Sequence, residues 1–146
     1  MRTPLRATLT LAVAVLALAA CGGAVQVEPP VPQGETAAAC RRLNDLLPGT
    51  LDGAERVESE PKSPYVAVWG AGEIALRCGV PRPAAMAPTD RLSEINGVGW
   101  FADPKLPTLY TAVTGSGYVE VTIARTHDPG EVLGALSAPI AKTLPA

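Results

Sequence analysis

The stretch YVAVWGAGEIALRC, residues 65–78, decides the fold, because it contains two alternating segments joined by a short glycine-rich turn. The first segment, residues 65–69, places its two valines on one side of an extended chain and Tyr65 and Trp69 on the other. The second segment, EIALRC, places its aliphatic residues and Cys78 on one side. We expect the two segments to form an antiparallel hairpin with their aliphatic sides on the same face of a sheet.

Two turn signals downstream predict further antiparallel strands. Asn96-Gly97 separates two β-prone segments, and an Asn-Gly pair is a strong short-range hairpin signal. Gly115-Ser116-Gly117 separates TLYTAVT from YVEVTIAR, and the second of these segments alternates cleanly. The sequence therefore predicts an antiparallel sheet of about five or six strands arranged in hairpins.

A predicted helix lies on either side of this strand region. ETAAACRRLNDLLPG, residues 35–49, has helical periodicity with Thr36 as its cap and Cys40 on its apolar face. DPGEVLGALSAPIAKTL, residues 128–144, has Asp128 at the cap position and an apolar stripe of its own. We expect the N-terminal and C-terminal helices to cover the aliphatic face of the sheet, which makes the fold class α+β.

The N-terminus has the pattern of a secretory signal. Arg2 and Arg6 precede an uncharged apolar run over residues 7–20, which is too short for the roughly 20 residues that span a bilayer. The run ends in LAAC at 18–21, which resembles the lipobox of bacterial lipoproteins. That resemblance implies cleavage before Cys21, diacylation of its thiol and anchoring on the outer face of the plasma membrane. An ordinary signal peptide with an incidental cysteine is the alternative.

These patterns divide the chain into three parts. Residues 1–20 form the predicted lipoprotein signal peptide. Residues 21–34 are rich in glycine and proline and have no periodicity, so we interpret them as a tether that stands the domain off the membrane. Residues 35–146 are the length of one small domain, which we expect to be a single α+β unit.

Two cysteines, Cys40 and Cys78, remain in the domain once Cys21 is assigned to lipidation. Both are predicted to point toward the same core, one from the helix and one from the strand. A disulfide is the default for such a pair in an oxidising compartment, and it would stabilise the domain by about 4 kcal/mol. A metal site is the alternative, but the chain has a single histidine and no CxxC spacing, so we expect no metal.

Composition argues against some classes of function. The formal net charge of the whole chain is −2, and no basic run is longer than Arg41-Arg42, so we expect no nucleic-acid partner. The sequence contains no readable catalytic or cofactor motif, and we expect no cofactor. The lone histidine, His127, lies in a loop before the second helix and is interpreted as a solvated residue. Glu73 and Glu120 are predicted on the outer sheet face, where we interpret them as solvated strand residues.

The strand parity suggests one candidate binding surface. Four aromatic residues and one arginine are predicted on the sheet face opposite the aliphatic one: Tyr65, Trp69, Tyr110, Tyr118 and Arg77. Aromatic side chains flanked by arginine are typical of protein and glycan interfaces. The alternative explanation is the ordinary preference of Tyr and Trp for strands.

Four segments of the chain resemble a known family: YVAVWG, LRCGVP, NGVGW and YVEV. The chain is similar to the actinobacterial lipoproteins and secreted proteins grouped as domain of unknown function 3515, over roughly residues 38–140. It differs at Val68, where that family is expected to have alanine before Trp69-Gly70. The resemblance implies an actinobacterial source and no particular activity.

We therefore expect a lipid-anchored, extracytoplasmic protein that acts as a non-enzymatic binding or accessory module in the cell envelope. Its expected partners are the membrane, through the anchor, and an envelope protein or glycan. The alternatives are a small envelope enzyme acting on wall or lipid substrates and a carrier of an apolar ligand.

Overall fold

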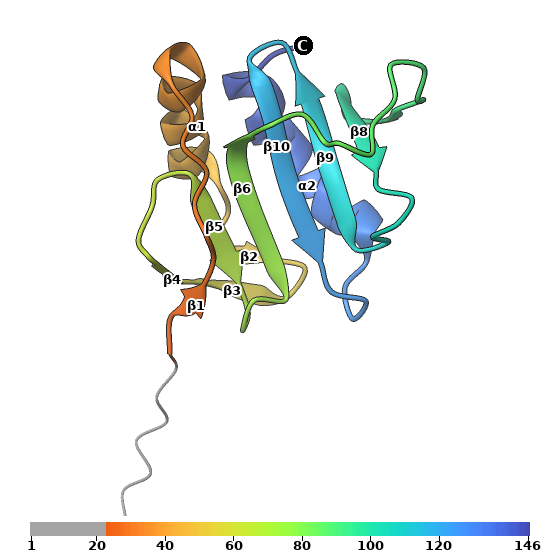
Figure 1. Cartoon of the computed structure of the whole chain (residues 1–146). Helices are drawn as coiled ribbons and strands as arrows, with labels where there is room; N and C mark the ends of the chain where they lie inside the picture. Colours follow the sequence, from red (N-terminus) through yellow and green to blue (C-terminus); the bar gives the residue numbers. More distant parts are fainter. Residues whose placement is uncertain (1–22) are drawn as a thin grey trace, which may run out of the picture.

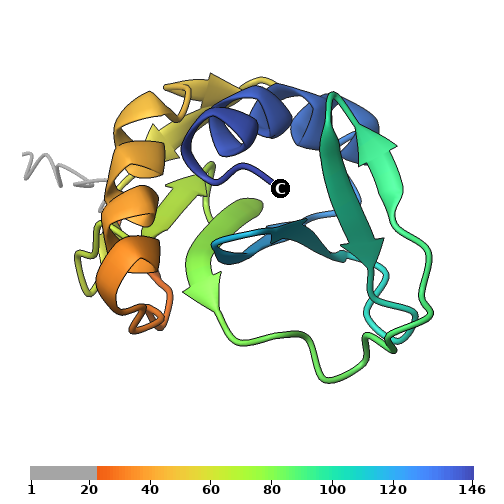
Figure 2. The same cartoon turned by 90° about the horizontal axis from the view of Figure 1, so that it is seen from above.

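A computed structural model describes residues 23–146 of the chain. The main sheet has eight strands in the order β2-β3-β5-β6-β10-β9-β8-β7, and its neighbouring strands are antiparallel. Both helices lie on one side of this sheet (Figures 1 and 2). The helices are α1 (Gly34–Leu46) and α2 (Pro129–Thr143). The strands are β1 (Val25–Gln26), β2 (Thr50–Leu51), β3 (Ala54–Val57), β4 (Ser59–Glu60), β5 (Val66–Trp69), β6 (Ile74–Val80), β7 (Ser93–Ile95), β8 (Val98–Ala102), β9 (Leu109–Thr114) and β10 (Gly117–Ile123). The α+β class is confirmed, with more strands than predicted.

The extra strands come mainly from residues 50–60, between α1 and the central hairpin. Asp52 and Gly53 form the β2–β3 turn with φ of 45° and 79°. An Asp-Gly pair is a hairpin signal of the same kind as Asn-Gly, so this turn could have been predicted. Asn96 and Gly97 likewise adopt φ of 47° and 81° in the turn between β7 and β8, which confirms that predicted hairpin.

The central hairpin forms as predicted, but its register reverses the faces of β5. Trp69 pairs with Ile74, and Ala67 pairs with Leu76. Residues paired across antiparallel strands share a face, so Trp69 lies with the aliphatic residues of β6 on the side that the helices cover. The prediction of a shared aliphatic face was therefore correct for β6 and wrong for β5.

The predicted disulfide joins α1 to β6. Cys40 and Cys78 form a bond with Cα atoms 5.6 Å apart, and both residues are buried. They lie in the core between the helices and the sheet, where the two sequence periodicities placed them.

The two helix starts differ in how they are capped. Asp128 caps α2 as predicted, because its carboxylate accepts from the backbone N–H groups of Gly130 and Glu131. At α1, the residue before the helix is Gln33, and it makes no side-chain cap. The predicted cap of α1, Thr36, instead lies inside the helix and donates its hydroxyl to the carbonyl of Ser116, 2.6 Å away.

The segment before α1 is packed onto the domain, which corrects its interpretation as a free tether. Strand β1 pairs in parallel with β4, and the backbone carbonyl of Glu28 accepts from Nε of Arg77 at 2.9 Å. Pro32 contacts the backbone at Gly79, whose φ is 88°. In Figure 1 this orange segment runs from β1 to the start of α1. Proline and glycine removed the periodicity from the sequence pattern, but tertiary contacts hold the segment in place.

Residues 1–22, which include the predicted signal peptide and Cys21, lie outside the described residues. Within residues 23–146, neither helix is long and apolar enough to cross a membrane.

Candidate functional site

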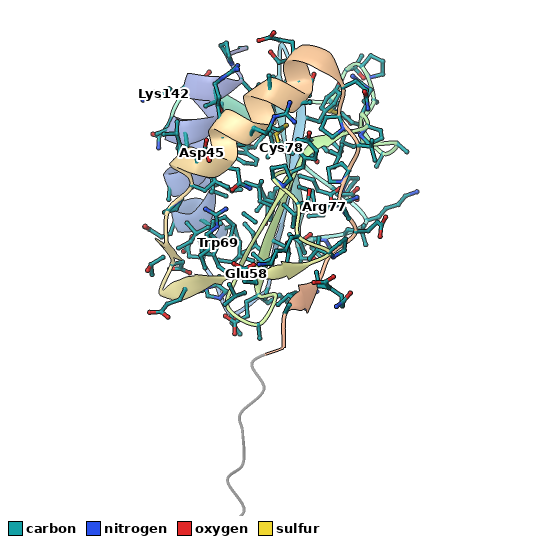
Figure 3. All side chains as sticks on the ribbon, turned by 90° about the vertical axis from the view of Figure 1, so that its left-hand side faces the viewer. Asp45, Glu58, Trp69, Arg77, Cys78 and Lys142 are labelled. Atoms are coloured by element: carbon teal, nitrogen blue, oxygen red, sulfur yellow. A yellow bond between two sulfur atoms is a disulfide. The ribbon has the colours of Figure 1, made fainter. Side chains whose placement is uncertain are left out.

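The predicted aromatic surface is divided between the two faces of the sheet. Trp69 has no exposed surface, and its indole N–H donates to the carbonyl of Pro48 at 2.9 Å. Tyr65 and Tyr110 pack against the core on the same side. Arg77 lies on the opposite side of the sheet, as Figure 3 shows for Trp69 and Arg77. The expectation of one outer aromatic face was therefore wrong, because the β5–β6 register places Trp69 in the core.

Two of the predicted residues, Arg77 and Tyr118, do share the outer face, but Arg77 is already bonded to other parts of the domain. Arg77 forms an ion pair with Glu120, 3.0 Å away, and also donates to the N-terminal segment. Tyr118 lies on the same face of the sheet as Glu120, because the two residues are two positions apart on β10. Glu120 is thus tied to Arg77, while Glu73 lies in the β5–β6 turn, so these two carboxylates do not form a pair.

A polar cleft lies along the edge of the sheet beside β3 and β5. It has a volume of about 600 Å³, and its polar lining residues are Asn44, Arg56, Glu58, Ser59, Lys62 and Ser63. These side chains and backbone come from α1, β3 and the segment that leads into β5. A concave site with a few convergent polar groups is the usual form of a ligand site. No sequence motif marked it, although all of its lining residues except Asn44 come from the stretch 56–67.

Arg56 is the cation held most firmly in this cleft. Its guanidinium donates to the side-chain oxygen of Asn44 at 2.6 Å and to the backbone carbonyl of Asn44 at 3.2 Å. It also lies over the ring of Trp69, with 5.9 Å between the guanidinium carbon and the ring centroid. Partial burial lowers the pKa of Arg56, and the nearby Asp45 opposes that shift. The guanidinium is therefore positioned in advance, with donors left over for a ligand.

Lys62 supplies the second cation of the cleft, and it is more exposed than Arg56. Its amine pairs with Glu58 at 2.9 Å, and both side chains are mostly exposed. The bond to Glu58 raises the pKa of Lys62. An exposed pair of this kind exchanges partners at little cost, so Lys62 is free to turn toward an anionic group in the cleft.

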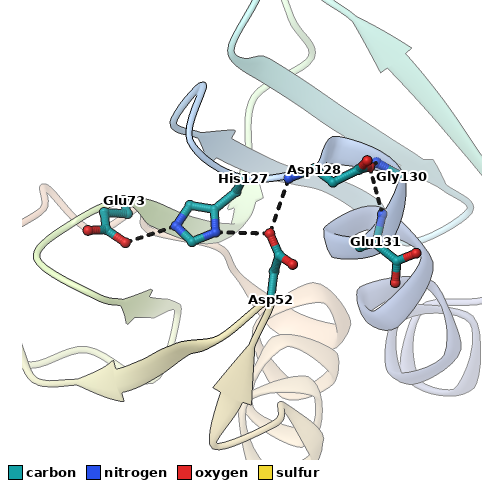
Figure 4. Close-up of polar contacts among 6 residues, drawn as sticks. All are labelled: Asp52, Glu73, His127, Asp128, Gly130 and Glu131. Atoms are coloured by element: carbon teal, nitrogen blue, oxygen red, sulfur yellow. Dashed lines mark hydrogen bonds and ion pairs between the residues drawn. The ribbon is translucent and has the colours of Figure 1, made fainter.

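A second polar cluster surrounds His127 at the end of the sheet (Figure 4). One ring nitrogen, Nδ1, lies 3.0 Å from Asp52 in the β2–β3 turn, and the other, Nε2, lies 2.8 Å from Glu73 in the β5–β6 turn. The same oxygen of Asp52 accepts from the backbone N–H of Asp128. The imidazole is only 10% exposed, so its interpretation as a solvated loop residue was wrong. Its partners lie 75 and 54 residues away in the sequence, so no local pattern could have identified them.

This arrangement suits a charged imidazole better than a general base. Two carboxylates face the two ring nitrogens, and both contacts are hydrogen bonds only when both nitrogens carry protons. The bond to Glu73, and then the bond to Asp52, raise the pKa of His127. A histidine that activates a nucleophile has one nitrogen on the nucleophile and one on a carboxylate, which is not the pattern here. The cluster therefore acts as an ionic clamp that joins two turns to the start of α2.

The remaining residues offer no cluster of metal ligands. Within the part of the chain that the structure describes, no group of three or more His, Cys, Asp or Glu side chains could hold a metal ion. The two domain cysteines are both used in the disulfide.

Comparison with known proteins assigns the chain to a family without assigning a function. Neither a search of curated proteins nor a search of solved structures found a match. The family model described as protein of unknown function DUF3515 matches residues 5–146. Because this match covers nearly the whole chain, including both cysteines of the disulfide and all the residues of the polar cleft, the protein belongs to the DUF3515 family.

Proposed function

We propose that this protein is a lipoprotein on the outer face of the plasma membrane, and that its domain binds a polar component of the cell envelope. The observation that carries the anchoring is the sequence LAAC at 18–21, preceded by a basic head and a short apolar run. Two acyl chains on Cys21 would give stable membrane attachment, which a single chain would not.

The polar cleft supports a binding role for the domain. Arg56 is fixed by Asn44 and Trp69, and Ser59 and Ser63 line the same space. A guanidinium binds carboxylates in two-point geometry, and hydroxyl and amide groups complement sugars and peptides. The ligand class that fits is therefore a glycan or peptide that carries a carboxylate. This proposal replaces the outer aromatic face with the cleft as the binding surface.

The alternatives have less support. An envelope hydrolase would need a nucleophile or an unpaired base, whereas His127 has both ring nitrogens next to carboxylates. A carrier of an apolar ligand would need space between the helices and the sheet. That region holds the buried rings of Trp69 and Trp100 and the aliphatic residues of the core.

Anchoring is tested by the variant Cys21→Ala in cells that express the full-length chain. We expect the wild-type protein to fractionate with membranes and to incorporate labelled fatty acid. The variant should do neither, because it lacks the thiol that would be acylated. Gly23→Ala is the matched control, since a Cβ at Gly23 would meet no other atom within 4 Å. Membrane retention of Cys21→Ala would contradict the proposed anchor.

Binding is tested by thermal unfolding of the domain in the presence of a panel of muropeptides and acidic glycans. A ligand that binds the folded state raises the Tm, and at a fixed ligand concentration the shift grows with the logarithm of the affinity. We expect at least one compound to raise the Tm of the wild type and of the control Arg91→Met. The same compound should not change the Tm of Arg56→Met. Arg91 is exposed and lies outside the cleft, so the control matches the change in charge. Equal shifts in all three proteins would contradict binding at Arg56.

A further inference from the structure

The N-terminal segment is fixed to one end of the sheet. The backbone N–H of Val25 donates to the backbone carbonyl of Glu58, and that of Val27 donates to the backbone carbonyl of Glu60, both at 3.1 Å. Figure 1 shows β1 at the end of the molecule where the β5–β6 turn also lies. We call this end the anchor end and define it by Val25, Val57 and the turn at residues 70–72.

The proposed lipid site is too close to the anchor end to allow a stand-off. Four peptide units separate Cys21 from Val25 in the sequence. A fully extended chain covers at most about 3.6 Å per residue, so their Cα atoms are no more than about 14 Å apart. The headgroup region of one leaflet is itself about 5–8 Å thick. A lipid on Cys21 would therefore hold the anchor end within reach of the headgroups.

The surface of the anchor end is apolar where the chain leaves it. A groove of about 480 Å³ lies there, and its apolar lining residues are Ala24, Val25, Val57 and Ala71. Val57 is 41% exposed although it belongs to a strand, and Ala71 is exposed at the tip of its turn. The groove therefore gives the anchor end a small apolar surface beside the residues that lead back toward Cys21 in the sequence.

The groove also adjoins the polar cleft. Val57 and Glu58 line both, so an apolar surface and a polar surface meet along one wall. The groove lies next to residue 23, and the polar cleft extends from the shared wall toward α1. This order of apolar and then polar surface matches the order of acyl chains and headgroups at the boundary of a bilayer.

Three of the carboxylates near this end have a basic partner, whereas Glu60, exposed on β4, has no ion pair among the described residues. Glu58 pairs with Lys62, and Asp52 and Glu73 both face His127. Anionic lipids repel unpaired carboxylates, and this repulsion falls off within a Debye length of the membrane surface. The internal pairs reduce this repulsion at the end that carries the anchor.

We infer that the anchor end rests on the outer leaflet of the bilayer, with the apolar groove in contact with phospholipid acyl chains. The inference depends on the proposed lipidation of Cys21. It fixes the orientation of the domain: the polar cleft then opens beside the headgroups, and the start of α1 points away from the membrane.

The test uses the lipidated full-length protein in vesicles of phosphatidylglycerol and phosphatidylethanolamine, with or without phosphatidylcholine brominated on its acyl chains. Bromine quenches tryptophan on contact. Ala71→Trp places a reporter at the anchor end, and Glu35→Trp is the matched control, because Glu35 is 83% exposed at the start of α1. Native Trp69 and Trp100 are buried, and their emission is subtracted with the parent protein.

We expect brominated lipid to remove most of the added emission of Ala71→Trp and little of that of Glu35→Trp. Adding Val57→Glu to Ala71→Trp should restore the emission, because a charge in the groove opposes acyl contact. Equal quenching of the two reporters, or none in protein that floats with the vesicles, would overturn the inference.

Failure of the anchor itself is recognised separately. Protein that does not float with vesicles has no lipid on Cys21, which refutes the proposed lipidation. The chain beginning at Cys21 is then coupled through that thiol to a maleimide phospholipid, since Cys40 and Cys78 are held in the disulfide. The same comparison of reporters then decides whether the anchor end contacts the bilayer.

Discussion

Removal of the Cys40–Cys78 disulfide should lower the free energy of unfolding by about 4 kcal/mol. The bond closes a loop of 38 residues. In the chain-entropy description, a cross-link that closes a loop of that length lowers the entropy of the unfolded chain by about 13 cal/mol/K. This raises the free energy of the unfolded chain by about 4 kcal/mol at 25 °C. Small domains have a total stability of about 5–15 kcal/mol, so the loss should be easy to measure.

The assay is urea unfolding of the oxidised domain, of Cys40→Ala, of Cys78→Ala and of the double variant, with any remaining thiol kept reduced. Each single variant removes the same cross-link as the double variant. We therefore expect the three variants to lose similar amounts of stability. The dependence of the free energy on urea should also steepen, because an unfolded chain without the cross-link exposes more surface.

Additive losses would refute this reasoning. If the double variant loses the sum of the two single losses, the effect comes from packing of each buried side chain and not from the loop. A loss below about 1 kcal/mol in all three would show that the unfolded chain gains little freedom when the loop is opened.

Three further predictions concern single contacts. Ser137→Ala should cost about 1–3 kcal/mol in urea unfolding, because it leaves the buried indole N–H of Trp100, now 3.0 Å from the serine hydroxyl, without an acceptor; a cost unchanged in a Trp100→Phe background would contradict this. The raised pKa of His127 means that its clamp stabilises the domain fully below about pH 6.5 and loses that effect as pH rises through the folded-state pKa. The midpoint of urea unfolding should therefore fall with rising pH in this window, and His127→Gln should flatten the fall; an unchanged slope would count against the clamp. Gly79→Ala should cost more than about 1 kcal/mol, because φ is 88° and a Cβ would lie 2.5 Å from Pro32; a neutral effect in thermal unfolding would mean that Pro32 is not packed there.

Local patterns in the sequence determined the elements of this protein. Alternation around residues 65–78 and the Asn96-Gly97 turn predicted hairpins that the structure contains. The cap at Asp128 needed only side-chain chemistry within three residues. The disulfide was predictable because helix and strand periods each point one cysteine toward the core. The interpretation of the N-terminal segment as a tether was wrong for the residues that pack on the domain, because proline and glycine remove periodicity without preventing tertiary contacts.

Only the tertiary structure decided which side chains meet. The predicted aromatic face depended on how β5 pairs with β6, and a strand's side-chain period of two means that one register choice moves Trp69 from surface to core. The His127 clamp joins residues that are 75 and 54 positions apart in the sequence. The polar cleft is lined mainly by the stretch 56–67, but it depends on the packing of that stretch against Asn44 of α1. The sequence by itself therefore determined the local elements, their order and the cross-link. The chain's path through space decided the sites, because each of them requires a contact between separate elements that no local preference encodes.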